Sequence, residues 1–371
     1  MVAREDRALS TRTVLALNSG SSSLKFGLYR VGAARTETLL AKTIATSDHG
    51  DAITRAGRFL SESGMPAPNA IGHRIVHGGP DLRQHGLIDD AMLRQLDAAA
   101  AFAPLHTPAA LSIIRFAQAH FPGLPQVACF DTTFHAQLPD VARVLPIAKD
   151  LRASGIQRYG FHPLSLESIV RQLGSDLPNR VVVAHLGNGG SITAIKGGRS
   201  IDTSMGLTPT GGVIMGTRSG DLDPGVLIYL MREKNFDAAT LEALVDHHSG
   251  LLGISGVASD MRRLHEAASS NPDARLAIEM FCYSVRKQIA AMTAVLAGLD
   301  LLVFTGGIGE NDAQVRAAIC GGLSWLGISL DETRNRSAGD PISDASSHCP
   351  VRVLASQEDE QIARHTWDLV S

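Results

Sequence analysis

Long hydrophobic runs are missing from this 371-residue chain. A transmembrane helix needs roughly 18 or more consecutive apolar residues, and no segment of the sequence approaches that length. The first residues, MVAREDRALSTR, are charged throughout and lack the apolar core of a secretory signal. We therefore expect a cytoplasmic protein with no membrane partner.

Cysteine, aromatic residues and charge of one sign are also scarce. The four cysteines lie far apart, without any C-x-x-C pair: Cys129, Cys282, Cys320 and Cys349. This spacing predicts reduced, packed thiols rather than a disulfide framework or a zinc site. A net charge of −3 without any Lys/Arg run argues against nucleic acid as a partner. Aromatic residues make up 5% of the chain against 36 glycines, which suggests that loops carry the function.

Several catalytic signatures are absent. There is no P-loop pattern G-x-x-x-x-G-K-[ST], and no G-x-G-x-x-G opens a helix after a strand, so neither standard nucleotide-binding fold is indicated. The patterns G-x-S-x-G and H-E-x-x-H are missing too, as are clustered His/Cys ligands. Any metal chemistry would therefore use oxygen ligands, as magnesium prefers.

Three segments share one pattern, in which an apolar, β-like run passes directly into a loop rich in Gly or Ser. The runs begin at Val14, Val181 and Leu301, and their loops read NSGSSS, HLGNGGS and TGGIGEN. In the first two a second β-like run follows, which predicts a hairpin whose glycines supply the positive φ of a tight turn. A helix follows the third loop. Two such hairpins half a chain apart suggest a duplicated α/β domain with a cleft between the copies.

Helix boundaries can be predicted from capping residues. Three helix starts are marked by a cap, a proline or both: Thr107-Pro108, Pro163 and Asp223-Pro224. Gly174 predicts the end of the helix that begins at Pro163. Ser356 with Asp359 resembles a capping box for a last helix. The polar stretch 334–348 is expected to be a surface loop.

The Gly/Ser-rich loops are suited to phosphate. Polyphosphate binds to backbone N–H groups in a concave loop that the chain can approach closely, and Asn18–Ser23 and His185–Ser191 have this composition. For either loop alone, an ordinary turn is the alternative interpretation. Two such loops together with TGGIGEN favour phosphate binding.

Two arginines lie in Gly-rich stretches with little other charge: Arg74 in GHRIVHGG and Arg218 in IMGTRSGD. A guanidinium in such a place is costly unless an anion or a carboxylate pairs with it. Each arginine is therefore a candidate anion ligand, and a structural ion pair is the alternative.

Four further polar residues have positions that suit chemistry. His106 and His162 precede expected helices, where the helix N-terminus favours an anion, although a histidine that donates to a carbonyl is the alternative. Asp131 follows a β-like run, and strand ends line ligand crevices in α/β sheets, although a turn aspartate is equally consistent. Glu358 lies in an expected first helical turn, where the helix dipole favours an acid in any case.

Taken together, the sequence resembles the acetate kinase family, the acetate and propionate kinases of the actin and sugar-kinase superfamily. The matching segments run in order from Leu17 to Thr366: LNSGSSSLKF, GHRIVHGG, APLHTP, FDTTFH, RYGFH, HLGNGGSITAI, DTSMGLTPTGGVIMGTRSGDLDP, GISGVASDMR, FTGGIGEN and SQEDEQIARHT. GHRIVHGG and MGTRSGDLDP are highly specific, whereas NSGSSS alone would not be.

The resemblance implies two duplicated ribonuclease H-like α/β domains with an ATP cleft between them. The first domain would comprise residues 1–148, with a C-terminal helix at 357–371 returning to it. Residues 149–356 would form the nucleotide-binding domain and a homodimer interface. The implied reaction is phosphoryl transfer between ATP and acetate.

The resemblance also implies roles for single residues. Asn18 and Glu358 would hold Mg²⁺ or Mn²⁺, directly or through water. ATP or ADP would be bound by residues of both hairpin loops and of two later segments: Ser21, Ser23, Lys25, His185, Leu186, Gly187, Asn188, Gly189, Asp260, Met261, Arg262, Gly307, Ile308, Gly309, Glu310 and Asn311. A small apolar socket for the acyl methyl group would be formed by Val76, Leu105, Phe161 and Pro209.

The same resemblance assigns four residues to the reacting groups. Arg74 and Arg218 would grip the carboxylate and the phosphoryl group in transfer, and His162 would stabilise charge on the phosphoryl group. A short carboxylic acid with a pKa of ~4 is already ionised at neutral pH, so Asp131 is expected to orient the carboxylate rather than to deprotonate it.

Three stretches depart from the family pattern. Thr107 replaces the Asn of PLHNP, and PLSL at 163–166 replaces GTSH, which removes a Gly and a His beside His162. SQED replaces TNEE or TDEE but keeps Glu358 as the acid that would bind metal.

Three alternative functions remain open. The first is a kinase that prefers propionate or, less readily, butyrate, since one methylene changes binding by only ~1–3 kcal/mol; Val76 favours acetate, because related propionate kinases tend to carry a smaller residue there. The second is an ATPase with a conformational output, against which the two arginines, Asp131 and His162 together argue. The third is an acyl-phosphatase, to which the altered FHPLSL could lead.

Overall fold

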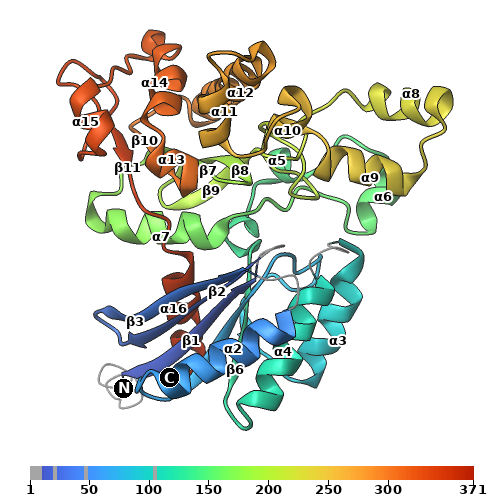
Figure 1. The fold of residues 1–371 in the computed structure, drawn as a ribbon, viewed down its shortest axis with the longest axis vertical. Coiled ribbons are helices and arrows are strands. Elements are labelled where there is room, and N and C mark those ends of the chain that lie inside the picture. The colour runs from blue at the N-terminus through green and yellow to red at the C-terminus, as the bar shows by residue number, and fades with distance from the viewer. Residues whose placement is uncertain (1–10, 20–22, 46–48, 103–106) are drawn as a thin grey trace. The chain divides into compact units, whose positions relative to one another are not determined.

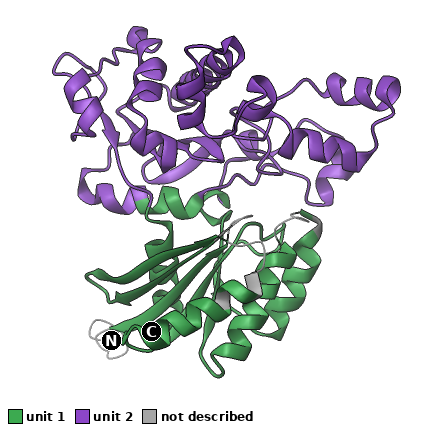
Figure 2. Ribbon diagram, viewed as in Figure 1, with its two compact units in different colours: residues 1–136, 163–168, 357–371 green, residues 137–162, 169–356 purple. Residues whose placement is uncertain are grey.

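The computed structural model describes residues 11–19, 23–45, 49–102 and 107–371. The chain divides into two compact units (Figure 2). Unit 1 comprises residues 1–136, 163–168 and 357–371, and unit 2 comprises residues 137–162 and 169–356. The domain boundary expected between residues 148 and 149 stays a prediction. Within the described ranges, none of the helices combines the length and the apolar character that crossing a bilayer requires.

Unit 1 contains a six-stranded sheet with the order β3-β2-β1-β4-β6-β5 (Figure 1). Its strands are β1 (Arg12–Ser19), β2 (Ser23–Val31), β3 (Thr36–Ala45), β4 (Ala70–Ile75), β5 (Gly86–Leu87) and β6 (Gln126–Phe130). β1 and β2 form the expected antiparallel hairpin, in which Asn18 lies opposite Lys25. β1 is parallel to β4, and β4 is parallel to β6.

Alternating side chains of β1 fill two separate cores. The helices of unit 1 are α2 (His49–Glu62), α3 (Asp90–Ala99), α4 (Thr107–His120), the first residues of α7 (Pro163–Leu173) and α16 (Glu358–Val370), with short 3-10 turns at Ala100–Phe102 and Thr133–His135. Leu15 and Leu17 pack with residues of α2 and α4. Val14 and Ala16 point to the opposite face of the sheet and pack with residues of α16. The last helix therefore completes the core of the first sheet.

Close packing of α16 depends on a glycine in β4. A Cβ atom added to Gly72 would lie 2.2 Å from Thr366 Oγ1 and 2.6 Å from Ile362 Cγ2, both on α16. Any larger side chain at this position would push the helix away from the sheet.

A buried histidine in β4 makes the stability of unit 1 depend on pH. His73 is 2% exposed and its Nε2 lies 2.7 Å from Gln126 Oε1. Burial lowers the pKa of His73 from 6.5 to about 4, although the Gln126 hydrogen bond opposes the shift. As pH falls below 6.5 the unfolded chain binds a proton before the folded chain does, so stability is lost between pH 6.5 and 4.

We expect this single group to lower the free energy of unfolding by about 1 kcal/mol between about pH 7.5 and about pH 5.5. Trp367 lies in unit 1, so in a Trp325→Phe background its fluorescence during urea unfolding reports on this unit. His73→Asn removes this titratable group. Between the two pH values its free energy of unfolding should therefore fall by about that much less than that of the wild type. Equal losses in both proteins would show that His73 is not the source.

Unit 2 repeats the sheet topology of unit 1. Its strands are β7 (Arg180–Leu186), β8 (Gly190–Lys196), β9 (Arg199–Thr203), β10 (Leu301–Thr305) and β11 (Val351–Val353), in the order β11-β10-β7-β8-β9. β7 forms an antiparallel hairpin with β8 and is parallel to β10, as β1 is to β2 and β4. The order β9-β8-β7-β10-β11 thus matches β3-β2-β1-β4-β6, which confirms the predicted duplication.

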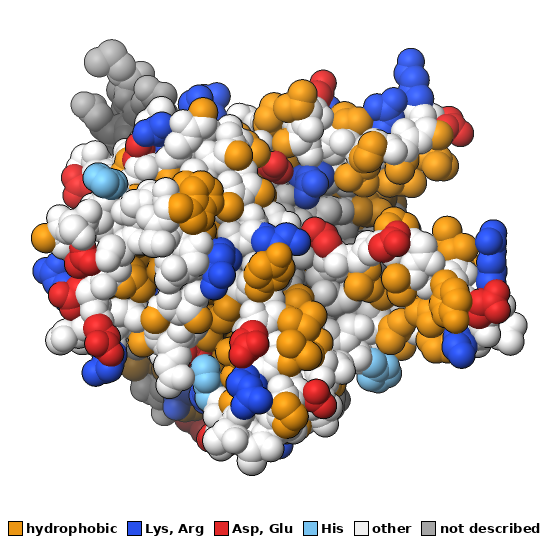
Figure 3. Space-filling view, turned by 90° about the horizontal axis from the view of Figure 1, so that it is seen from above, with side chains coloured by type: hydrophobic (Ala, Val, Ile, Leu, Met, Phe, Trp, Pro, Cys, Tyr) orange, Lys and Arg blue, Asp and Glu red, His pale blue; other side chains and the backbone are white. Residues whose placement is uncertain are grey.

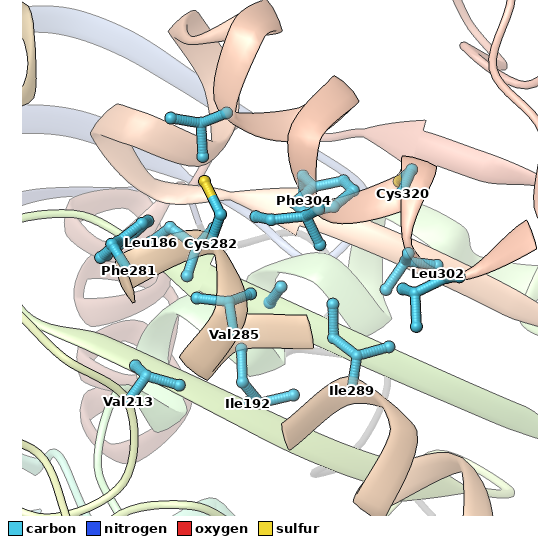
Figure 4. Close-up of a cluster of buried hydrophobic side chains, with 14 of the residues drawn as sticks. Leu186, Ile192, Val213, Phe281, Cys282, Val285, Ile289, Leu302, Phe304 and Cys320 are labelled. Atoms are coloured by element: carbon cyan, nitrogen blue, oxygen red, sulfur yellow. The ribbon is translucent and has the colours of Figure 1, made fainter. Parts of the chain in front are cut away.

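One long helix forms the centre of the unit 2 core. The helices are α5 (Asp140–Arg143), α6 (Lys149–Ala153), the rest of α7, α8 (Pro224–Lys234), α9 (Ala238–His247), α10 (Gly250–Ser255), α11 (Met261–Ala267), α12 (Pro272–Leu296), α13 (Gly306–Asn311), α14 (Ala313–Gly321) and α15 (Glu332–Ser337), with 3-10 turns at Gly174–Asp176 and Ser324–Leu326. Phe281, Val285 and Ile289 of α12 pack against Ile192 and Phe304 of the sheet (Figure 4).

Three local predictions were wrong. TGGIGEN is not a loop after Thr305, because Gly306–Asn311 forms α13. The stretch 334–348 is only partly a loop, since α15 extends through Ser337. Ser356 does not cap α16, which begins at Glu358 with Gln357 as N-cap.

Candidate active site

Arg74 stands one residue before the end of β4 and binds a carboxylate. Its Nε and Nη2 atoms donate to Asp131 Oδ2 at 3.1 and 2.5 Å. Asp131 directly follows β6, as predicted, and is 1% exposed. Burial alone would lower the pKa of Arg74, but Asp131 and Glu358 raise it further than burial lowers it. The guanidinium is therefore charged and held on one side by a buried acid.

A cluster of oxygen-bearing side chains lies beside this ion pair. Asn18 Nδ2 donates to Glu358 Oε2 at 3.2 Å and to Asp359 Oδ1 at 2.8 Å, while Asn18 Oδ1 accepts from Arg74 Nη1 at 3.4 Å. Asn18 is the next-to-last residue of β1, and both acids lie in the first turn of α16. Two strands and one helix of unit 1 thus bring these groups together.

The two adjacent acids would gain from a cation. Burial raises the pKa of Asp359 and the charge of Glu358 raises it further, whereas Asn18, Lys25 and Arg74 lower it. Two half-buried carboxylates and an amide oxygen are hard donors of the kind that Mg²⁺ prefers. The donor set therefore fits a divalent cation, which would also offset the repulsion between the carboxylates.

His162 adopts an unusual backbone conformation at the start of α7. Its φ of 64° lies in the left-handed region, which is uncommon for a residue other than glycine and is often found at functional sites. The side chain does not cap the helix; its Nδ1 lies 2.9 Å from Ser191 Oγ at the start of β8. The ring also stacks on His185, with 4.1 Å between centroids.

His162 and Arg218 converge on one point next to Gly189. A Cβ atom built on Gly189 would lie 3.3 Å from Arg218 Nη1 and 3.4 Å from His162 Nε2. Arg218 Nη1 also donates to the Pro209 carbonyl at 3.3 Å. A guanidinium and an imidazole beside a Gly-rich hairpin form a cradle for an anion, which any side chain at position 189 would fill.

A cavity of about 520 Å³ lies in unit 2 next to this hairpin. It is lined by residues from the hairpin, α11, α13 and the turn after α13: Gly187, Asn188, Ser259, Asp260, Met261, Arg262, Gly307, Ile308, Asn311 and Asp312. Asp260 caps α11 and binds the guanidinium of Arg262, which lowers the pKa of Asp260 to about 2. Eight of the residues expected from the sequence to bind nucleotide therefore share one cavity.

Other expected nucleotide residues within the described part of the chain do not line this cavity. Glu310 turns back to accept the N–H groups of Gly306 and Ser356, each at 2.9 Å. Gly309 and Leu186 are buried in unit 2, and Lys25 is exposed on β2. Ser21, Leu105 and His106 lie outside the described residues, as does the side chain of Ser23. Their roles stay predictions.

The described residues of the expected acyl socket differ in burial. Val76 follows β4 and is half-buried. Phe161 is 1% exposed, and Pro209 is half-buried in the segment that follows β9. Their role in binding an acyl group stays a prediction.

Sequence reasoning missed three residues of these sites. Asp359 binds Asn18 directly, and Ser259 and Asp312 line the cavity. Asp359 had been interpreted as part of a helix cap, but its position next to Glu358 in an acidic first turn was a usable signal. Ser259 and Asp312 each adjoin an expected nucleotide residue, so extending those segments by one position would have found them.

The duplicated sheets and the Gly-rich hairpins define a kinase of the actin and sugar-kinase fold class. The profile of the acetokinase family matches residues 37–364. The chain therefore belongs to the acetokinase family.

Individual relatives are similar over nearly their whole length. An acetate kinase of Nitrobacter hamburgensis is 41% identical over 390 residues, which cover 96% of each chain. The crystal structure of a propionate kinase from Francisella tularensis is 38% identical with a TM-score of 0.87, and that of Porphyromonas gingivalis acetate kinase is 33% identical with a TM-score of 0.85. Each comparison covers 97% of this chain and 100% of the other.

Proposed function

We propose that this protein transfers the γ-phosphoryl group of ATP to acetate, reversibly and with Mg²⁺, giving acetyl phosphate and ADP. The observation that carries the proposal is the buried Arg74–Asp131 pair beside Asn18, Glu358 and Asp359, because it offers a carboxylate site next to a cation site. Full-length similarity to acetate kinases supports the same reaction.

In the proposed reaction a carboxylate oxygen attacks the γ-phosphorus while the bond to the β–γ bridging oxygen breaks and ADP leaves. Acetate is ionised at neutral pH, so no strong base is needed. Arg74 binds the carboxylate, and Asp131 orients the guanidinium through its two hydrogen bonds. His162 and Arg218 donate to the oxygens of the transferring group, where negative charge is stabilised most effectively by preorganised donors.

The cation would be held by Asn18, Glu358 and Asp359, directly or through water. When bound, Mg²⁺ neutralises phosphate charge. The nucleotide is assigned to the 520 Å³ cavity, where Asn188, Ser259 and Asn311 offer polar groups. The proposal also includes the remaining residues that the family resemblance implies, as ligands of the nucleotide or as part of the acyl socket.

A propionate kinase is the second candidate. The structural relative from Francisella tularensis carries that name and is 38% identical, slightly more than the 33% of Porphyromonas gingivalis acetate kinase. Val76 supports acetate, because a branched side chain would reduce the room for an additional methylene.

We also propose that the protein forms a homodimer through a surface of unit 2. Several large apolar side chains of α8 and α12 are exposed: Val226, Ile228, Tyr229, Met231, Leu276, Met280 and Tyr283. Figure 3, which views the molecule from above, shows hydrophobic side chains gathered in groups on this face. Exposed apolar groups of this kind often mark interfaces, and sedimentation velocity would measure the mass; a monomer at all concentrations would contradict the proposal.

The function is tested by a hydroxamate assay with ATP and Mg²⁺, comparing acetate, propionate and butyrate by kcat/KM. We expect the highest value for acetate and about 10-fold or more lower values for butyrate. A preference for propionate would support the second candidate. Hydrolysis of acetyl phosphate without ADP, and no acyl phosphate from any acid, would instead indicate the phosphatase.

A further inference from the structure

Unit 1 contains a cluster of two histidines and a glutamate that the proposed reaction does not use. His85 lies between β4 and β5, Glu167 lies in α7 and His365 lies in α16. One ligand atom of each lies within 4.8 Å of the other two. His365 Nε2 is 2.5 Å from Glu167 Oε2, and the rings of His85 and His365 are in contact, with 4.0 Å between centroids.

This composition would suit a metal, but the hydrogen bonds of His85 argue against one. His85 Nδ1 accepts the backbone N–H of Phe130 at 3.0 Å. The Thr133 hydroxyl donates to the Phe130 carbonyl, so it accepts from His85 Nε2–H at 3.3 Å. Metal-binding histidines instead donate from their second nitrogen. Burial and the charge of His365 lower the pKa of His85 to about 3, so the ring stays neutral in this arrangement.

His85 therefore fixes the chain on both sides of Asp131. Its two nitrogens bind Phe130, which precedes Asp131, and Thr133, which follows it by two residues. The Asp131 carboxylate in turn binds Arg74. Movement of His85 would shift the acid that orients the guanidinium.

His365 connects this point to the proposed cation site. His365 lies seven positions after Glu358, about two helical turns, so both lie on the same side of α16. Glu167 anchors His365 from another helix, and Gln361 lies 3.1 Å from the same ring nitrogen. These contacts fix the position of α16 along its axis and its rotation about that axis. They thereby fix the positions of Glu358 and Asp359 in its first turn.

The contacts form a closed circuit within unit 1. From Arg74 one path runs through Asn18 to the acids of α16. The other path runs through Asp131 and the end of β6 to His85 and His365. Both paths end on α16. The distance between Asp131 and Glu358 therefore depends on the contacts of both paths.

We propose that His85, Glu167 and His365 form a positioning cluster that sets the spacing between Asp131 and the acids of α16, and with it the affinity of the cation site. The inference rests on the proposed function for its consequence in catalysis. Outer groups that orient metal ligands typically contribute 10–100-fold to metal affinity or activity.

The test measures Mn²⁺ affinity by electron paramagnetic resonance, and kcat in the hydroxamate assay. His365→Ala and Glu167→Ala should each weaken Mn²⁺ binding by about 10-fold or more and lower kcat by a similar factor. Metal-free ADP affinity should change by less than about 2-fold, because the nucleotide cavity lies in unit 2. Glu167→Gln keeps an acceptor for His365 and should stay within roughly 3-fold of wild type.

Arg364→Ala is the matched control. Arg364 precedes His365 and ties the same turn of α16 to Thr36 by a 2.7 Å hydrogen bond outside the cluster. This variant should lower the melting temperature without changing Mn²⁺ affinity. Equal Mn²⁺ affinity in all variants, or an equal loss in Arg364→Ala, would overturn the proposal.

Two further outcomes are distinguishable. One extra Mn²⁺ or Zn²⁺ per chain that disappears in His85→Ala would make the cluster a metal site and overturn the positioning role. Because Mn²⁺ affinity is measured without turnover, a wild-type protein inactive on all three acids would overturn the proposed function alone.

Discussion

Arg74→Ala should lower kcat/KM for acetyl phosphate formation by at least ~10²-fold, the loss typical of removing a preorganised charge stabiliser. The guanidinium is largely buried, binds Asp131 and lies beside the proposed cation site. Arg74→Lys keeps the charge but cannot reproduce the two donors to one carboxylate oxygen, so it should still lose about 10-fold or more. The measurement is the hydroxamate assay with varied acetate.

Removing Arg74 also leaves the buried Asp131 without its guanidinium, which costs about 3–5 kcal/mol in comparable pairs. The matched control is Arg180→Ala in unit 2. Arg180 Nε and Nη2 donate to Asp300 Oδ1 at 3.0 and 2.5 Å, nearly the geometry of Arg74 with Asp131. Arg180→Ala should lose stability but keep kcat/KM within about 3-fold. A similar fall in activity for both variants would mean that Arg74 is only a structural ion pair.

Arg218→Ala should lower kcat/KM by a comparable factor of at least ~10²-fold, and chiefly through kcat. Its Nη1 atom and His162 Nε2 converge beside Gly189, so the loss should fall on the transferring phosphoryl group. Acetate KM should change less than in the Arg74 variants. Stopped-flow or quench measurements of single turnovers would separate chemistry from product release.

Arg180→Ala serves as the control here as well, because it lies in the same unit as Arg218. If Arg218→Ala retained more than a tenth of the wild-type kcat/KM, the anion cradle at Gly189 would not be the phosphoryl site. A large rise in acetate KM with unchanged kcat would instead assign Arg218 to acetate binding.

The duplicated sheets could be predicted from the sequence because their signals are local. In both hairpins an apolar run meets a turn rich in glycine, and Val14 to Leu17 alternate between two hydrophobic cores. Strand order was not local information. The structure provides it through the parallel pairing of β1 with β4 and of β7 with β10.

The errors arose where a contact with another element overrides a local preference. Ser356 and Asp359 have the spacing of a capping box, yet the Ser356 N–H binds Glu310 and Asp359 binds Asn18, 341 positions away. The glycines of α13 favour a loop, but the buried Arg316 guanidinium donates to the carbonyls of Gly309 and Glu310 in the last turn of α13. Neither partner can be identified from spacing along the chain.

The candidate site could likewise be predicted only where its residues belong to motifs. Arg74, Asp131, Asn18 and Glu358 were named from motifs, and the structure brings them together in unit 1. The cluster of His85, Glu167 and His365 was not, because its members are separated by 82 or more positions and belong to no motif.

The packing of α16 has a consequence for protein synthesis. β1 is translated before the rest of its sheet, but its Val14 and Ala16 face packs against α16, a helix that begins at residue 358. All of unit 2 is translated in between. The apolar face of the first sheet therefore stays exposed while the cavity in unit 2 can already form. Contacts of such long range are slow to form and expose nascent chains to aggregation. The same delay keeps Glu358 and Asp359 away from Asn18 until α16 has been translated, so a nascent chain can form the cavity assigned to the nucleotide well before it can assemble the proposed cation site.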